Sequence, residues 1–145
     1  MRYLDTSVIV AAFTNEQYTD VAQAALRPDA GDPPVISDWV FTETSGALST
    51  KVRARRLRPR DRIEAWSAFT ELVERTFTVL PISAAHFRTA AVLVEDPATG
   101  LRSGDALHLA VASLAQATML TLDRGMSNAA DLLQIPAVLL SATSR

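Results

Sequence analysis

Four acidic residues interrupt or border apolar segments of this sequence, and they are its strongest candidates for chemistry. Asp5 interrupts the run YLDTSVIV, and Asp123 interrupts MLTLDRG in the same way. Glu43 lies within WVFTETSGAL, and Asp105 directly precedes the apolar run ALHLAVASLA. In a parallel α/β sheet, strand ends and the starts of the following helices share one edge. We therefore expect these four carboxylates to lie close together.

A cluster of this composition is suited to a metal ion. Ionised carboxylates in one pocket repel one another, which raises their pKa values unless a cation neutralises them. Oxygen ligands without thiolate or imidazole select a hard divalent ion, so Mg²⁺ or Mn²⁺ is the expected cofactor. Such a centre suits phosphodiester hydrolysis, because the metal generates hydroxide and stabilises the charged transition state.

Each acid also has a local interpretation that involves no chemistry. Asp5 is able to cap the helix that follows it, and Asp105 is favoured by the macrodipole at a helix N-terminus. Asp123 is able to stabilise the turn toward Gly125, and Glu43 is able to lie exposed on its helix. These interpretations weaken jointly, because the fold predicts all four residues at one edge.

Several other functions lack their sequence signatures. The chain has no cysteine, which excludes thiol nucleophiles and thiolate zinc sites, and its two histidines disfavour a histidine zinc site. Its five glycines form neither GxGxxG nor a P-loop, and the nucleophile motif GxSxG is missing. Ser7 replaces the second aspartate that haloacid-dehalogenase-type phosphatases need after strand 1. The single lysine, Lys51, does not lie late in the chain as a receiver domain requires.

Short apolar segments alternate with helical patterns along the chain. Strands are predicted at residues 2–5, 34–37, 77–82, 119–123 and 137–140. Helices are predicted between them, at residues 6–13, 15–27, 37–55, 59–73, 83–95, 103–114 and 127–133. Short strands separated by helices favour a parallel sheet with helices on both faces. The length of 145 residues fits a single domain, residues 1–145.

Composition predicts a soluble, cytoplasmic protein. Hydrophobic residues make up 48% and charged residues 21% of the chain, as in ordinary globular domains. Asp5 does not fit a signal peptide, and no apolar run approaches the ~18 residues of a membrane span. We therefore expect no membrane partner.

Positive charge is concentrated in one segment. The formal net charge is −2, yet residues 51–62, KVRARRLRPRDR, hold seven basic residues and one acidic residue. Such a stretch is able to grip backbone phosphates near the acidic edge, and the RNA-binding candidates are Arg53, Arg55 and Arg56. The alternatives are a solvated helix end and a contact with an acidic protein segment.

The segments YLDTSVIVA, FTE, RSGDALHLA and TLD, in this order, resemble the four acidic motifs of PIN-domain proteins. More specifically, the sequence is similar to VapC-type toxins of toxin–antitoxin pairs. The resemblance implies a three-layer α/β/α fold with a parallel five-stranded sheet of order 3-2-1-4-5. It also implies an Mg²⁺- or Mn²⁺-dependent endoribonuclease with an RNA substrate, a cognate antitoxin as partner, and a homodimer.

The resemblance assigns roles to the four acids. Asp5, Asp105 and Asp123 are the expected direct metal ligands, and water is the expected nucleophile. Glu43 is expected to bind the metal directly or through water, or to help deprotonate the attacking water. All four are therefore candidate catalytic residues.

Other polar residues lie beside these acids in the sequence. Thr6, Ser7 and Thr121 resemble the small hydroxyl residues that flank such sites, where they orient a carboxylate or hold water. Core or cap roles explain these three hydroxyls equally well. His108 lies three residues after Asp105 and is expected to be structural rather than catalytic.

Two rival functions stay open. A PIN nuclease outside toxin–antitoxin systems would act on structured RNA or DNA, and an inactive PIN fold would serve as an interaction module. The intact set of four acids disfavours the inactive form. For an association surface, the apolar candidates are Trp39, Val40 and Trp66, with core packing as the alternative.

Overall fold

A computed structural model describes residues 1–29 and 31–141 of the chain. Within these residues, five parallel strands form one sheet in the order β3-β2-β1-β4-β5. The strands are β1 (Arg2–Leu4), β2 (Pro34–Ser37), β3 (Thr78–Leu80), β4 (Thr118–Thr121) and β5 (Ala137–Leu139). The predicted sheet and its strand order are confirmed.

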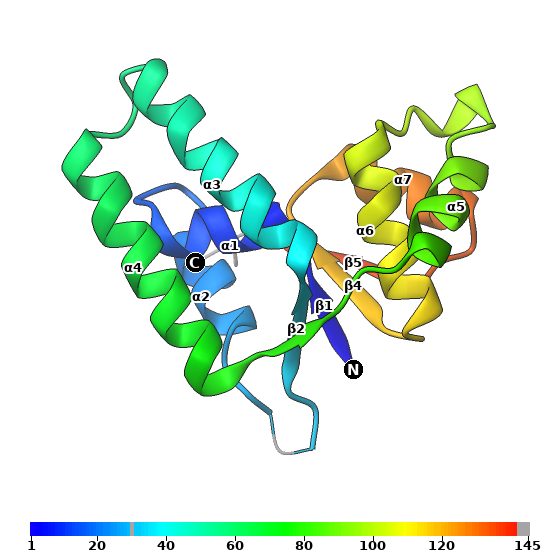
Figure 1. The fold of residues 1–145 in the computed structure, drawn as a ribbon, viewed down its shortest axis with the longest axis horizontal. Helices are drawn as coiled ribbons and strands as arrows, with labels where there is room; N and C mark the ends of the chain where they lie inside the picture. Colours follow the sequence, from blue (N-terminus) through cyan, green and yellow to red (C-terminus); the bar gives the residue numbers. More distant parts are fainter. Residues whose placement is uncertain (30, 142–145) are drawn as a thin grey trace.

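Two groups of helices cover the two faces of the sheet (Figure 1). One face carries α1 (Thr6–Phe13), α2 (Thr19–Ala25), α3 (Asp38–Arg53) and α4 (Pro59–Thr76). The other carries α5 (Ala84–Leu93), α6 (Ser103–Leu114) and α7 (Arg124–Leu132), with a short 3₁₀ helix (Pro97–Thr99) between α5 and α6. The three-layer α/β/α arrangement is therefore confirmed. No helix within the described residues is long and apolar enough to cross a membrane.

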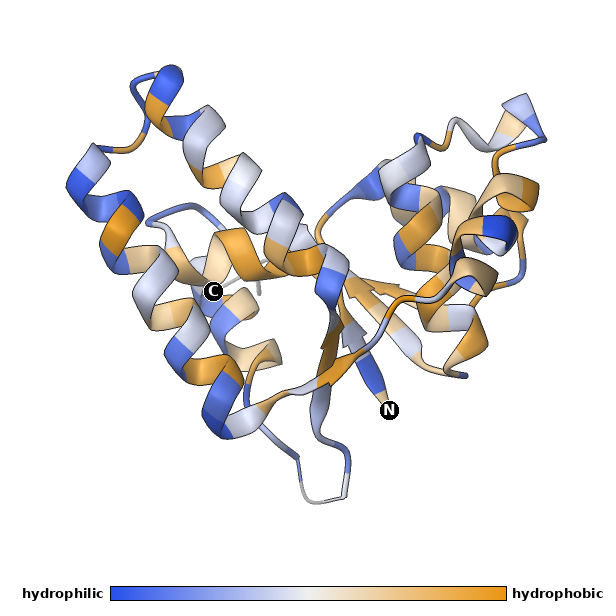
Figure 2. Ribbon diagram, viewed as in Figure 1, coloured by the Kyte–Doolittle hydropathy of each residue, from blue (hydrophilic) through white to orange (hydrophobic). Residues whose placement is uncertain are grey.

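The strands are buried because helices cover both faces of the sheet. Tyr3, Leu4 and Ile36 are 0% exposed, which explains why these strands are continuous apolar segments rather than alternating ones. Helix α6 is buried over residues 106–112. Figure 2 shows hydrophobic residues concentrated along the strands, whereas hydrophilic residues gather around the turn between α3 and α4.

Two helices begin at residues other than those predicted. The helix predicted from Asn15 begins at Thr19, because the Thr19 hydroxyl bonds to the backbone of the preceding segment and holds it in a turn. The helix predicted from residue 127 begins at Arg124, because the Asp123 side chain caps it there. A turn held by the Thr19 side chain therefore sets the start of α2, and a side-chain cap sets the start of α7.

The apolar residues predicted for an association surface lie mainly in the core. Val40 is 0% exposed, so that prediction is wrong for this residue. Trp66 and Trp39 are partly buried against the core. The large exposed apolar side chains of α5 are Phe87, which is 58% exposed, and Val92, which is 62% exposed.

Phe69 of α4 lies at the centre of an aromatic cluster. Its ring centroid is 5.3 Å from that of Phe41, 5.7 Å from Trp66 and 5.9 Å from Phe13, and its side chain is fully buried. The cluster joins α4 to α1 and α3, so its integrity fixes how this helical layer packs.

We predict that Phe69→Ala lowers the free energy of unfolding by about 3–5 kcal/mol, because it opens a cavity where three helices meet. Urea unfolding followed by circular dichroism measures the loss. Phe87→Ala, on the exposed face of α5, is the matched control and should change stability by less than about 1 kcal/mol. Equal, small losses in the two variants would show that Phe69 is not central to the core.

Candidate active site

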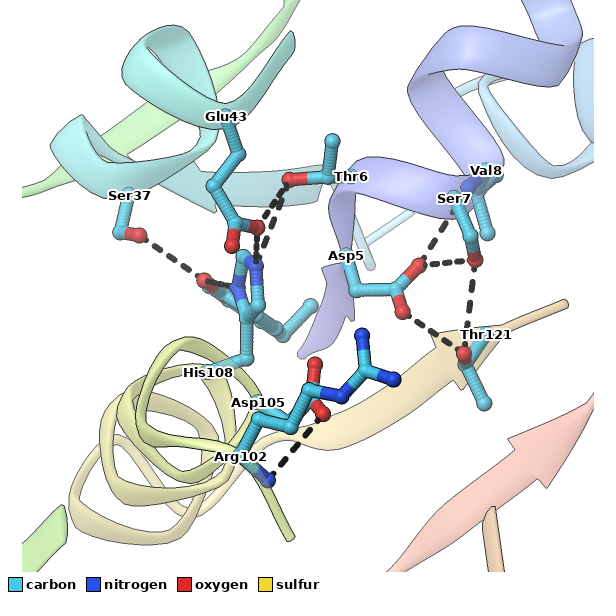
Figure 3. Close-up of polar contacts among 11 residues, drawn as sticks. Asp5, Thr6, Ser7, Val8, Ser37, Glu43, Arg102, Asp105, His108 and Thr121 are labelled. Carbon is cyan, nitrogen blue, oxygen red and sulfur yellow. Dashed lines mark hydrogen bonds and ion pairs between the residues drawn. The ribbon is translucent and has the colours of Figure 1, made fainter. Parts of the chain in front are cut away.

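The four predicted acids lie at the carboxyl edge of the sheet. After β1 the chain adds β2 and β3 on one side, and then returns to add β4 and β5 on the other. The neighbouring ends of β1 and β4 therefore form the switch point, where parallel α/β sheets bind ligands. Asp5 directly follows β1, and Asp123 lies two residues after β4. Glu43 reaches this edge from α3 and Asp105 from the first turn of α6 (Figure 3).

Asp5 is almost completely removed from water, at 2% exposed. Its Oδ1 accepts hydrogen bonds from the Ser7 hydroxyl (2.6 Å) and the Val8 N–H (3.3 Å), and its Oδ2 accepts one from the Thr121 hydroxyl (2.7 Å). The Val8 bond makes Asp5 the N-cap of α1 as well. Burial raises the pKa of Asp5, and the nearby His108 and these donors offset the effect only in part. A carboxylate has about four acceptor positions, so one is left on Oδ2 for a cation.

Glu43 is held through a single oxygen. Its Oε2 accepts hydrogen bonds from the Thr6 hydroxyl at 2.8 Å and from Nε2 of His108 at 2.5 Å (Figure 3). Burial raises the pKa of Glu43, but the hydrogen bond of His108 and its charge when the ring is protonated, followed by the Thr6 and Trp39 side chains, bring it below its usual value. Glu43 is therefore ionised at neutral pH, as either a ligand or a base must be.

Asp105 and Asp123 line one pocket of about 250 Å³. Burial raises the pKa of Asp105, and repulsion from Asp123 and Glu43 raises it further. Oδ1 of Asp123 accepts a hydrogen bond from the Met126 N–H at 3.1 Å, which leaves the other oxygen able to bind a ligand. Three carboxylates thus act on one another across this edge.

The donor set fits a hard divalent cation in its chemistry. All four acids offer carboxylate oxygen, which Mg²⁺ and Mn²⁺ prefer, and a cation would relieve the repulsion felt by Asp105. Within residues 1–29 and 31–141, however, no three acidic or histidine side chains stand close enough together to hold a metal ion. To share a cation with Asp5, which its hydrogen bonds hold in place, Asp105 and the exposed Asp123 would have to rotate toward it.

Each of the three flanking hydroxyls contacts an acid. Thr6 donates to Glu43, whereas Ser7 and Thr121 donate to Asp5. The Ser7 oxygen also accepts the Leu122 N–H at 2.9 Å, which links α1 to the end of β4. Their positions agree with orientation of the carboxylates, and that role stays a prediction.

The basic residues selected in the sequence lie at the far end of α3. Arg53 ends this helix, and Arg55 and Arg56 follow in the turn to α4. Arg53 is ten residues beyond Glu43, which is about 15 Å along a helix axis. These arginines therefore do not touch the acids, and only a substrate that spans this distance would contact both. None of the three forms an ion pair with another described residue.

Two residues that sequence analysis did not select lie at the site. Arg102 lines the pocket of Asp105, and its side chain extends past that residue toward Asp5 in Figure 3. His108 bonds to Glu43. The spacing of both residues could have indicated a place at the site, because each lies three positions from Asp105. The signal is weaker for Arg102, which directly precedes the first turn of α6. No local pattern links His108 to a glutamate 65 positions away.

Comparison with known proteins identifies the family. The family model of the PIN domain matches residues 2–132. The chain therefore belongs to the PIN-domain family. Among curated proteins, none matches the sequence significantly.

Solved structures share this fold over nearly their whole length. VapC20 from Mycobacterium tuberculosis is 20% identical, with 89% of this chain and 95% of that one covered and a TM-score of 0.69. FitAcB from Neisseria gonorrhoeae is 19% identical, with 94% and 96% covered and a TM-score of 0.66. VapBC-1 from nontypeable Haemophilus influenzae is 15% identical, with 96% and 98% covered and a TM-score of 0.67. At these identities the similarity establishes the fold alone.

The raised pKa of Asp5 predicts a pH-dependent effect of Asp5→Asn on stability without metal. A carboxyl whose folded pKa is raised stabilises the fold while protonated, and that stability is lost as pH rises from its ordinary pKa of 3.8 through the folded value. Asparagine cannot ionise, so the variant should gain stability relative to the natural protein between about pH 4 and pH 7. Urea unfolding in EDTA at both pH values measures this difference. If the stability of Asp5→Asn relative to the natural protein stays constant or falls from pH 4 to pH 7, Asp5 carries no desolvation penalty.

Proposed function

We propose that the protein is a metal-dependent endoribonuclease and the toxin of a toxin–antitoxin pair. The observation that carries the proposal is that Asp5, Glu43, Asp105 and Asp123 all lie at one edge of a PIN-family sheet, around its switch point. Two similar structures support it. VapC20 is described as a toxin that cleaves the sarcin-ricin loop, and a structure from Klebsiella pneumoniae is a toxin-antitoxin complex.

In this proposal the acids divide the chemistry among them. Asp5, Asp105 and Asp123 hold Mg²⁺ or Mn²⁺, with Asp5 as the fixed ligand and the other two as movable ones. The bound ion lowers the pKa of water and stabilises negative charge on the scissile phosphate. Glu43 binds the ion directly or through water, or takes a proton from the attacking water. Thr6, Ser7 and Thr121 keep Glu43 and Asp5 in orientation through the hydrogen bonds described above.

A cognate antitoxin and a second copy of the chain are the proposed protein partners, and the cytoplasm is the proposed compartment. The similar toxin-antitoxin complex supports the first partner. For the second, α5 exposes Phe87 and Val92, and exposed apolar side chains in one region are typical of association surfaces.

We predict that Asp5→Asn abolishes RNA cleavage while the fold is kept. The substitution preserves shape but removes the charge that fixes the cation, so the cleavage rate should fall by at least about 100-fold at saturating Mg²⁺ or Mn²⁺. Cleavage of a pool of cellular RNAs provides the assay. Asp131→Asn on the exposed side of α7 loses the same charge and should cleave normally. Full activity in Asp5→Asn would refute the site.

A second substitution tests the basic turn. Reversing Arg53, Arg55 and Arg56 to Glu should weaken RNA binding and make it less dependent on salt. The magnitude of the negative slope of log K against log salt should fall by roughly 2–3, because each lost phosphate contact reduces that magnitude by about 0.7–0.9. Filter binding at several salt concentrations measures the slope. A matched charge reversal of Arg27, Arg75 and Arg88 serves as control. If both triple variants change the slope equally, the turn is only part of the general surface charge.

A further inference from the structure

A continuous chain of buried hydrogen bonds leads from the core to Glu43. The Ser37 hydroxyl lies 2.8 Å from that of Tyr3, which lies 2.7 Å from Nδ1 of His108. Nε2 of His108 then lies 2.5 Å from Oε2 of Glu43 (Figure 3). Ser37 and Tyr3 are 0% exposed and His108 is 1% exposed. The proposed function gives a role only to Glu43, so the other three members need an explanation.

The donor and acceptor inventory fixes the direction of this chain for a neutral His108. An ionised carboxylate only accepts, so the ring proton lies on Nε2 and points at Glu43. The ring then accepts at Nδ1, which requires the Tyr3 hydroxyl to donate. Burial raises the pKa of Tyr3 above its usual value, so the hydroxyl keeps the proton that it donates to His108. The Tyr3 oxygen in turn accepts from Ser37, so the Tyr3 hydroxyl and both ring nitrogens of His108 have partners.

The hydrogen-bond chain and Thr6 both bond to the same oxygen of Glu43. Oε2 receives both bonds, whereas within the described residues no donor has hydrogen-bond geometry to Oε1. The indole N–H of Trp39 lies on the side of Oε1 and helps to lower the pKa of Glu43. Oε1 instead faces Gly104, where an added Cβ would lie only 2.7 Å away. Glycine at this point of α6 therefore leaves room for the free oxygen, and the bonds to Oε2 determine where that oxygen lies.

We propose that His108, oriented by Tyr3 and Ser37, is a positioning residue that fixes the side chain of Glu43. It holds Oε2 in the core and thereby presents Oε1 at the N-terminus of α6, beside Asp105. The consequence for catalysis rests on the proposed function, whereas the dependence of Glu43 on His108 does not. A merely structural histidine would fill the same space without determining where Oε1 lies.

Tyr3→Phe is the sharpest test, because it removes one hydroxyl from the chain and keeps the ring. We expect kcat for RNA cleavage to fall by about tenfold or more, as for partners that orient metal ligands, with KM within about twofold of its natural value. Gly104→Ala approaches Glu43 from the opposite side and should also lower kcat. Thr14→Val removes a buried hydroxyl remote from the site, so it should lower stability comparably and leave kcat unchanged.

Histidine ¹⁵N spectra of the metal-free protein provide a readout that does not require activity. In the natural protein His108 should be a single Nε2–H tautomer whose proton exchanges slowly, because Glu43 only accepts. Tyr3→Phe should keep this tautomer, but Nδ1 loses the Tyr3 hydroxyl, so its resonance should shift and the Nε2 proton should exchange faster. Calorimetric titration with Mn²⁺ should show weaker binding in Tyr3→Phe than in Thr14→Val. His86, the other histidine, should keep its spectrum in every variant.

The outcomes separate this inference from the proposed function. If Tyr3→Phe keeps the natural kcat, Mn²⁺ affinity, Nδ1 resonance and Nε2 proton exchange while Glu43→Gln is inactive, the positioning role is overturned and the nuclease proposal stays intact. If the natural protein cleaves no RNA, the proposed function fails. The His108 spectrum and the Mn²⁺ affinity then still decide whether His108 determines the geometry of Glu43.

Discussion

Asp5 places a carboxylate at the end of the central strand where almost no water reaches it, and the rest of the site is arranged around that charge. Transferring an ionised carboxylate out of water costs far more than a few hydrogen bonds return. Ser7, Thr121 and the Val8 N–H compensate only in part, which is why the pKa of Asp5 stays raised. The group is therefore stable either as the neutral acid or beside a cation.

Sheet topology explains why further acids gather near this one. Because β4 returns to pair with β1, the loops after both strands meet at one point of the edge. Helix α6 then directs its first turn to the same place, where Asp105 also benefits from the helix dipole. The local interpretations of Asp5 and Asp123 as helix caps hold together with a role in the site, since a carboxylate that caps with one oxygen still offers the other.

Much of this arrangement was predictable from the sequence, because acids that interrupt apolar runs mark strand ends and helix starts. The strand order came from the family resemblance and the acids from their positions, whereas periodicity did not foresee the late start at Thr19. That start depends on a side-chain bond to the preceding turn. The link between His108 and Glu43 was also beyond sequence reasoning, since it joins two helices that only the tertiary fold brings together. Arg53 lies far from the acids because α3 is long, and the sequence pattern alone did not show this separation.

We propose that the charge of Asp5, with Asp105 and Asp123 rotated toward it, defines a cation site at the switch point. Anomalous diffraction from crystals of the natural protein soaked in Mn²⁺ tests it directly. We expect a peak about 2.0–2.6 Å from Oδ2 of Asp5, with Asp105 or Asp123 as a second ligand. A saturated crystal with no peak at this edge, or with Mn²⁺ bound only elsewhere, would contradict it.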